Sequence, residues 1–194
     1  MVKLSRFEKA KGISMKLHLG CGTRHFPGYI NIDQVDGYNV DLVCDISKLP
    51  YEDNSVDVIY ACHVLEYFDW QEAESIVLPE WYRVLKPGGT IRIAVPYFDS
   101  IVRWYIDKGR CDLSECIGLL FGRQYYNNKY QYHKCVYDHD TLYILLLNVG
   151  FGSIHCYNWE NTEHSHIDDC SQAYLPHMDK KNGLLMSLNI EAYK

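Results

Sequence analysis

The sequence predicts an α/β protein with a mostly parallel sheet, and three observations carry this prediction. Short runs rich in Val, Ile, Leu and Tyr recur along the chain, and turn residues bound each of them. Runs such as 56–61 are apolar at nearly every position, which suits a parallel strand covered on both faces. Helical patterns separate the later strand candidates. The length of 194 residues suits one domain over residues 1–194.

The first half of the chain supplies a lead-in over residues 1–14, where we expect a short helix, and then five strand candidates. The strand candidates are Lys16–Leu19, Tyr29–Asp33, Val40–Cys44, Val56–Ala61 and Thr90–Val95. Between the last two, Asp69 is a candidate N-cap with Glu72 as its capping-box partner. Pro79 suits the first turn of a continuing helix, and Lys86-Pro87-Gly88-Gly89 is expected to end that helix.

The second half of the chain is less regular. Asp140–Val149 predicts a helix that ends at Gly150. Phe151–Trp159 predicts a sixth strand, and alternation of apolar and polar residues over Leu184–Tyr193 predicts a seventh. Residues 97–135 show no clear pattern but hold many aromatic side chains. Residues 160–183 form a polar segment, and loops of this length are usually functional or disordered.

Composition narrows the class of protein. The formal net charge is −6, and no basic block is present, which argues against general nucleic-acid binding. No run reaches the roughly 20 apolar residues that a membrane span needs, and the first residues lack the apolar core of a signal peptide. The eight cysteines include no Cys-x-x-Cys pair, so we expect reduced thiols in a cytoplasmic protein and no metal site.

The strongest functional signal is a glycine loop followed by an acidic strand end. The run Lys16-Leu17-His18-Leu19-Gly20-Cys21-Gly22 leads from an apolar strand into two glycines, and the next strand ends on Asp33. Glycine lets a ligand approach the backbone closely, and a carboxylate accepts hydrogen bonds from a ribose diol. The pattern therefore predicts a site for a nucleoside-bearing cofactor.

Further motifs follow in a fixed order. They are Cys44-Asp45-Ile46-Ser47-Lys48-Leu49-Pro50, Ser55–Glu66 and Arg83-Val84-Leu85-Lys86-Pro87-Gly88-Gly89. With the glycine loop and Asp33, this ordered set resembles the class I S-adenosylmethionine-dependent methyltransferases, in detail over residues 16–96 and in outline beyond. The end of the chain, with Asp168–Asp179 before Leu185–Asn189, is similar to compact methyltransferases associated with surface-polysaccharide biosynthesis.

The resemblance implies a single Rossmann-like domain. Its sheet would have seven strands, mostly parallel with an antiparallel last strand, and helices on both faces. Residues 16–96 would form the cofactor half, 97–183 the acceptor-side segments and 184–194 the last strand. One departure is that Thr23–Gly28 leaves no room for the usual first helix, so this crossover is expected to be a loop or a single turn.

The resemblance also assigns S-adenosylmethionine as cofactor and gives roles to matching residues. Gly20, Cys21 and Gly22 would face the amino-acid half, and Asp33 the ribose hydroxyls. Asp45 would accept from the adenine amine, with the Ile46 amide facing the ring. Cys62 and His63 would lie close to the sulfonium group. The alternatives from the residues themselves are a plain turn for the glycines, a solvent-facing strand end for Asp33 and a helix cap for Asp45.

Candidates for the acceptor side follow the fifth strand. His133 and Asp99 are candidate general bases, because a sugar hydroxyl must lose a proton. The alternative for His133 is a structural role beside the tyrosines. Tyr97, His166, Asp168 and Asp169 are candidate acceptor-binding residues. The last three have three possible roles: to orient a base, to bind acceptor hydroxyls or to hold a divalent ion. The alternative is that they belong to an ordinary polar loop.

The leading hypothesis is O-methylation of a sugar hydroxyl in a glycan or a glycan precursor. Aromatic side chains with polar tips in the acceptor-side segments suit sugars. One alternative is methylation of a small metabolite, an RNA or a protein. A second is a non-catalytic donor-binding partner subunit. The sequence leaves the oligomeric state open.

Overall fold

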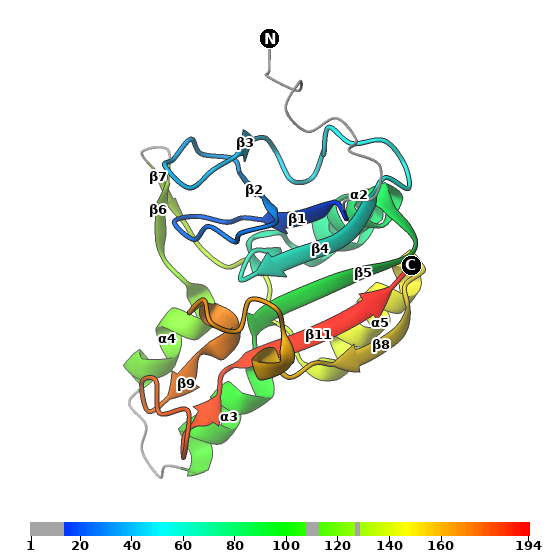
Figure 1. The fold of residues 1–194 in the computed structure, drawn as a ribbon. Helices are drawn as coiled ribbons and strands as arrows, with labels where there is room; N and C mark the ends of the chain where they lie inside the picture. Colours follow the sequence, from blue (N-terminus) through cyan, green and yellow to red (C-terminus); the bar gives the residue numbers. More distant parts are fainter. Residues whose placement is uncertain (1–13, 108–112, 127–128) are drawn as a thin grey trace.

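The computed structural model describes residues 14–107, 113–126 and 129–194, so nearly all of the expected lead-in lies outside the described residues. Its centre is a seven-stranded sheet in the order β3-β2-β1-β4-β5-β11-β8 (Figure 1). Pairs from β3 to β5 are parallel, and β11 is antiparallel to both neighbours, which confirms the predicted fold. The strands are β1 (Lys16–Leu19), β2 (Ile30–Asp33), β3 (Leu42–Val43), β4 (Val56–Cys62), β5 (Leu85–Pro96), β8 (Gly152–Cys156) and β11 (Ser187–Tyr193).

One face of the sheet is covered by two helical segments. The first runs through α1 (Trp70–Glu72), a π-helical turn over Ala73–Val77 and α2 (Leu78–Val84). The predicted capping box of Asp69 and Glu72 begins it. The wide π-turn directly precedes Pro79, whose nitrogen has no proton to donate. The second segment is α5 (His139–Val149), which ends at Gly150 with a φ of 116°, as predicted.

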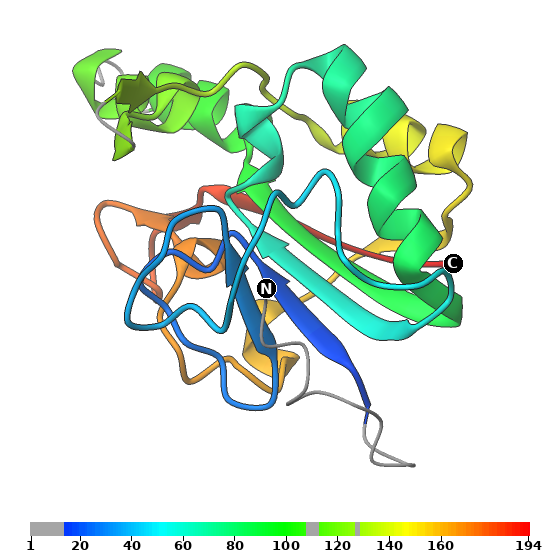
Figure 2. The same ribbon diagram turned by 90° about the horizontal axis from the view of Figure 1, so that it is seen from above.

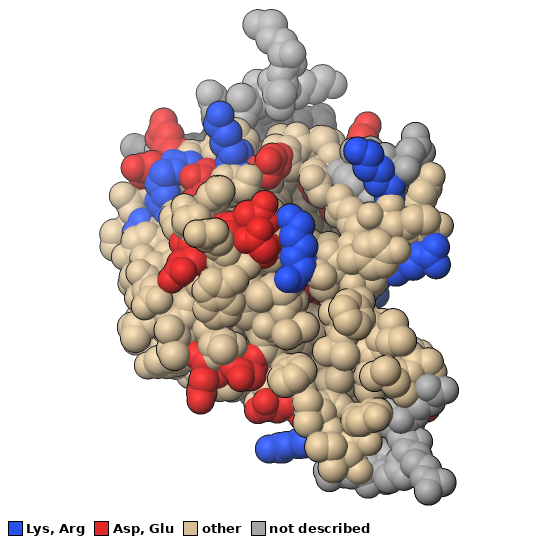
Figure 3. All heavy atoms as spheres, turned by 180° about the vertical axis from the view of Figure 1, so that it is seen from behind, with Lys and Arg blue, Asp and Glu red and all other residues tan. Residues whose placement is uncertain are grey.

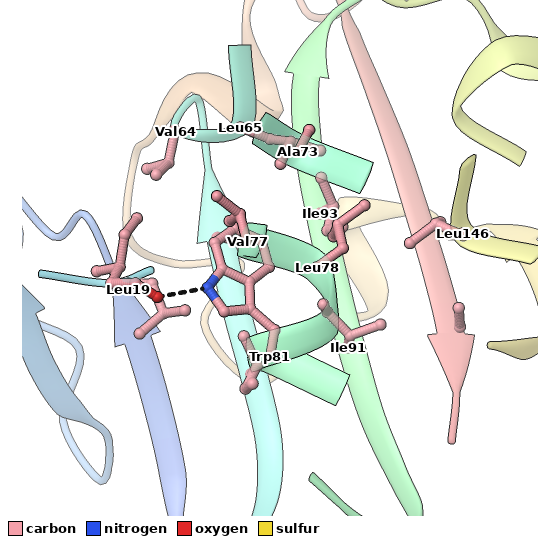
Figure 4. Close-up of a cluster of buried hydrophobic side chains, with 14 of the residues drawn as sticks. Leu19, Val64, Leu65, Ala73, Val77, Leu78, Trp81, Ile91, Ile93 and Leu146 are labelled. Atoms are coloured by element: carbon pink, nitrogen blue, oxygen red, sulfur yellow. Dashed lines mark hydrogen bonds between the residues drawn. The ribbon is translucent and has the colours of Figure 1, made fainter. Parts of the chain in front are cut away.

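Trp81 on α2 connects this helical layer to the loop that follows β3. Its side chain is fully buried among apolar residues that include Leu19 and Ile93. Its indole Nε1 donates a hydrogen bond to the Ile46 carbonyl at 2.9 Å (Figure 4). The loop that follows β3 is therefore fixed by a core residue.

The other face is covered by loops and short 3-10 helices. The Thr23–Gly28 crossover contains no helix, as its length predicts. The segment after β8 contributes η4 (Trp159–Asn161) and η5 (Cys170–Gln172) (Figure 2). Helices are expected on both faces of the sheet, and on this face they are single 3-10 turns. Phe26 stacks here on Tyr60 of β4, with ring centroids 5.3 Å apart.

The acceptor-side segments form a cap beyond the carboxyl ends of the central strands (Figure 1). They are α3 (Phe98–Asp107), α4 (Leu113–Phe121), the hairpin of β6 (Gln124–Tyr126) and β7 (Lys129–Gln131), and the small pair of β9 (Tyr174–Leu175) and β10 (Leu184–Leu185). Ile101, Trp104, Cys116 and Met186 form their apolar core. Within the three described ranges, no helix has both the length and the apolar character that crossing a membrane requires.

Candidate active site

Two adjoining cavities open at the carboxyl ends of β1, β2 and β4. The large cavity has a volume of about 890 Å³, and the small cavity about 440 Å³. Both volumes fall in the usual range for small-ligand sites. The residues that border both cavities are Gly20, Gly22, Thr23, His63, Tyr67 and Gln124. A group transferred between two ligands would have to pass at this shared boundary.

The glycine loop forms one side of that boundary. Gly20 has a φ of +65°, and a side chain there would overlap a methyl group of Val64. The Gly22 amide donates to Oδ2 of Asp33 at 2.9 Å, which holds the loop against the end of β2. The Cys21 amide donates to the Ile32 carbonyl at 3.0 Å, and its side chain is buried beside the small cavity. The two glycines therefore leave open backbone at the shared wall.

Two carboxylates border the large cavity with acceptor capacity to spare. Asp33 accepts from the Gly22 amide on one oxygen and from the Val35 amide at 3.0 Å on the other. A carboxylate has about four acceptor positions, so two remain for a diol. Asp45 uses only Oδ1 to accept from the amide and hydroxyl of Ser47, at 2.8 and 2.7 Å. No helix follows this turn in the described chain before β4, so Asp45 is not a helix cap, and Oδ2 is left for a ligand.

Replacing Asp33 with alanine is expected to weaken binding of S-adenosylhomocysteine by about 1–3 kcal/mol, because ribose hydroxyls would lose a charged acceptor. Isothermal titration calorimetry measures the effect. Asp140→Ala is the matched control, because Asp140 is an exposed carboxylate on α5 that borders neither cavity. Equal dissociation constants for Asp33→Ala and the unmodified protein would refute the role of Asp33.

His63 lies at the boundary between the cavities in a strained backbone conformation, with a φ of +53°. Its Nδ1 is 3.5 Å from Oε1 of Glu66, and its Nε2 is 3.5 Å from the Ser187 hydroxyl. Ser187 donates its own proton to Asn189, so it accepts from Nε2 of His63. This assignment leaves Nδ1 unprotonated and facing Glu66.

Glu66 is the site residue that the sequence reasoning missed. It lies on η2 (Leu65–Tyr67), its side chain is 0% exposed, and neither carboxyl oxygen has a hydrogen-bond partner among the described residues. Burial raises the pKa of Glu66 to about 8 and lowers that of His63 to about 3. The available signal was the spacing of three residues between His63 and Glu66 directly after a strand.

His133 lies near the same carboxyl oxygen of Glu66, with its Nε2 3.8 Å from Oε1. Its Nδ1 is 3.2 Å from the Leu119 carbonyl, which can only accept, so Nδ1 carries the proton and Nε2 a lone pair. Burial lowers the pKa of His133, which keeps the ring neutral. A side chain at Gly122 would overlap this ring. The unprotonated nitrogens of both histidines thus lie 3.5 and 3.8 Å from the same oxygen of Glu66, and the lack of a donor at either contact suits a protonated Glu66.

The structure places the other predicted residues as follows. Ile46 borders the large cavity and Cys62 the small one. Asp169 also borders the small cavity, but Tyr60 and Ser171 already donate hydrogen bonds to its two oxygens. The remaining four border neither cavity, and they are Tyr97, Asp99, His166 and Asp168.

Three of those four residues make contacts elsewhere, and His166 is exposed. Tyr97 donates to Asp99 at 3.2 Å, and Asp168 lies 3.5 Å from the Lys180 ammonium on the surface. The described residues contain no cluster of His, Cys, Asp or Glu that would hold a metal ion. Tyrosines of the β6–β7 hairpin and the segment after it line the outer wall of the large cavity, and they are Tyr125, Tyr130 and Tyr132.

The molecular surface carries mixed charge. On the face in Figure 3, Lys and Arg side chains are scattered among Asp and Glu and form no continuous basic surface. Lys134, at the edge of the large cavity, is paired with Glu72 at 2.8 Å.

Comparisons with known proteins agree with this fold. The methyltransferase domain family matches residues 27–93. None of the curated proteins matches the sequence. A methyltransferase of Thermotoga maritima, described as a possible histamine N-methyltransferase, is similar in structure, with a TM-score of 0.58 and 16% identity over 93% of this chain and 82% of that chain.

Two archaeal structures are similar to the same degree. A methyltransferase of Archaeoglobus fulgidus has a TM-score of 0.56 and 18% identity, over 95% of this chain and 87% of its own. One from Methanosarcina mazei has a TM-score of 0.56 and 16% identity, over 94% and 93%. The chain therefore has the fold of the S-adenosylmethionine-dependent methyltransferases and contains a match to their domain family, and together these support S-adenosylmethionine as its cofactor.

Proposed function

We propose that this protein is a methyltransferase that transfers the methyl group of S-adenosylmethionine to a hydroxyl of a sugar, in a glycan or its precursor. The observation that carries the proposal is the pair of adjoining cavities, with nucleoside-type carboxylates on one side and buried imidazoles on the other. Tyr125, Tyr130 and Tyr132 line the large cavity beyond Gln124, which borders both cavities, so a sugar that extends from the small cavity past Gln124 would pack its CH groups against these rings. We place the reaction in the cytoplasm, where the free thiols of the described cysteines would persist.

The residues of the large cavity would hold the cofactor. Asp33 would bind the ribose hydroxyls, Asp45 the adenine amine, and the open backbone at Gly20 and Gly22 would pass beside the amino-acid half. Gly22 supports this fit, because a Cβ there would meet no protein atom within 4 Å, so its backbone is open to a ligand. When bound, S-adenosylmethionine supplies an electrophilic methyl group.

The residues of the small cavity would prepare the acceptor. A sugar hydroxyl has a high pKa, so a base must take its proton as the new bond forms. We assign that base to His133, whose Nε2 holds a lone pair. Glu66 does not reach the cavity surface, so it acts as a positioning residue that stabilises the imidazolium from 3.8 Å. Asp99 remains a second candidate base from the sequence, and its position outside both cavities favours His133.

The test is a mass-spectrometric screen with deuterated S-adenosylmethionine. Sugars, sugar nucleotides, small amines, RNA and proteins are offered as acceptors, and transfer of the labelled methyl group is recorded. Labelled methyl on a sugar oxygen is the expected result. Transfer only to amines, RNA or proteins would overturn the sugar assignment. Donor binding without transfer to any acceptor would instead identify a donor-binding subunit.

A further inference from the structure

Arg24 places an unbalanced positive charge at the rim of the small cavity. It lies in the loop after β1, and its Nε donates to the Asp168 carbonyl at 2.6 Å. None of the ion pairs between described residues includes Arg24, so the two terminal nitrogens of its guanidinium face no carboxylate. Lys134, the cation that borders the large cavity, has Glu72 as its partner. Arg24 therefore differs from the other cavity cation in lacking a counter-charge.

The acidic residue of the small cavity cannot supply that counter-charge. Asp169 is buried, its Oδ2 accepts from the Tyr60 hydroxyl at 2.6 Å, and its Oδ1 accepts from the amide and hydroxyl of Ser171. Three hydrogen bonds within the fold stabilise this carboxylate where it is. The positive charge of Arg24 is left for a ligand.

The charge of Arg24 reaches the boundary between the cavities. The pKa of His63 is lowered by burial first, and then by the neighbouring His133 and by Arg24. At Cys170, which also borders the small cavity, the charge of Arg24 opposes the rise in pKa that burial causes, whereas the charges of Asp169 and Asp168 add to that rise. The guanidinium thus acts on groups inside the cavity, although the side chain is exposed at its rim.

We propose that the methyl acceptor is an anion whose carboxylate or phosphate group binds Arg24 in the small cavity. This inference rests on the proposed methyltransferase function. The carboxylate of S-adenosylmethionine is balanced by its ammonium, so the sulfonium leaves one net positive charge, and a negatively charged acceptor would offset the repulsion between this charge and the guanidinium. The planar guanidinium presents paired donors that suit both groups. A sugar acid or a sugar phosphate fits these requirements, whereas a neutral sugar does not.

Calorimetry on the protein saturated with S-adenosylhomocysteine tests the inference. The probes are glucuronate against its uncharged analogue glucuronamide, and glucose 6-phosphate against glucose. Glucuronate or glucose 6-phosphate is expected to bind at least about tenfold more tightly than its uncharged partner, since a charge-assisted pair is worth this much. The pair that shows the difference distinguishes a carboxylate from a phosphate.

Variants of Arg24 complete the test. Arg24→Gln is expected to remove the preference for the charged probe, Arg24→Lys to retain part of it, and Lys181→Gln, which removes an exposed charge outside both cavities, to leave it intact. Equal binding of charged and uncharged probes, no binding of either anion, or an unchanged preference in Arg24→Gln would overturn the inference. Failure of S-adenosylhomocysteine to bind the unmodified protein would instead overturn the proposed function.

Discussion

Replacing Glu66 with glutamine is expected to lower the rate of methyl transfer by about 100-fold or more and, at the same time, to stabilise the fold. The carboxyl of Glu66 lies between Nδ1 of His63 and Nε2 of His133, at 3.5 and 3.8 Å. With a pKa of about 8, its carboxylate form is accessible near neutral pH, and that negative charge would stabilise the imidazolium formed when His133 takes the proton of the acceptor. An amide cannot take up this charge, so the imidazolium would lose its stabilising partner.

The gain in stability follows from the raised pKa. The pKa of Glu66 rises from an ordinary value of 4.5 to about 8 in the folded protein. Its contribution to stability is therefore fully present below pH 4.5 and is lost as the pH rises toward 8. Glutamine removes this dependence. The advantage of Glu66→Gln over the unmodified protein should be about 3 kcal/mol larger at pH 7.5 than at pH 5, at 1.36 kcal/mol for each pH unit.

Urea unfolding at the two pH values measures the stability of the variant, and steady-state kinetics with the acceptor from the screen measures its activity. We expect kcat to fall while the affinity for S-adenosylhomocysteine is unchanged. Glu74→Gln is the matched control, because Glu74 is half-buried, borders neither cavity and bonds only Asn148 among the described residues. Destabilisation of Glu66→Gln with full activity would show that Glu66 is an ordinary structural residue.

We expect His164 to make the stability of the folded protein sensitive to acid. This side chain is 3% exposed, packs against the rings of Phe26 and Tyr60, and has no hydrogen-bond partner on either nitrogen within the described structure. Burial lowers its pKa from 6.5 to about 4. The unfolded chain therefore binds a proton below pH 6.5 that the folded protein does not, and stability is lost as the pH falls from 6.5 toward 4.

Replacing His164 with leucine removes this titration. We expect the free energy of unfolding of His164→Leu, relative to the unmodified protein, to be about 2 kcal/mol higher at pH 5 than at pH 7.5. The reason is that pH 5 lies 1.5 pH units below the ordinary pKa of 6.5, and each unit is worth about 1.36 kcal/mol. Comparing two pH values cancels the pH-independent cost of repacking. His177→Leu, at an exposed histidine, should show no such difference. An equal effect of His164→Leu at both pH values would contradict the account.

Much of the fold is predictable from the sequence because its signals are local. The capping box of Asp69 and Glu72, the stop at Gly150 and the short crossover at Thr23–Gly28 depend on neighbouring residues, and the structure has all three. Residues 97–135 gave no clear pattern because α3 and α4 are short and amphipathic. They are held by long-range contacts, such as those of Ile101 and Cys116 with Met186.

The residues of the candidate site also fall into those that local sequence order predicts and those that depend on long-range contacts. Gly20, Asp33 and Asp45 stand at strand ends, where sequence order alone brings side chains to one edge of the sheet. Glu66 escaped notice because its importance comes from complete burial between two histidines, one of which is 67 residues away along the chain. Tyr97 and Asp99 follow β5 as expected, but Tyr97 pairs with Tyr137 and Asp99 lies on α3, and neither borders a cavity.

A crystal structure of the protein with S-adenosylhomocysteine tests the central claim most directly. We predict that the ligand occupies the large cavity, with the ribose hydroxyls on Asp33, the adenine between Asp45 and the Ile46 amide, and the sulfur directed past His63 toward the small cavity. A ligand bound outside the large cavity, or one whose sulfur points away from His63, would contradict the account.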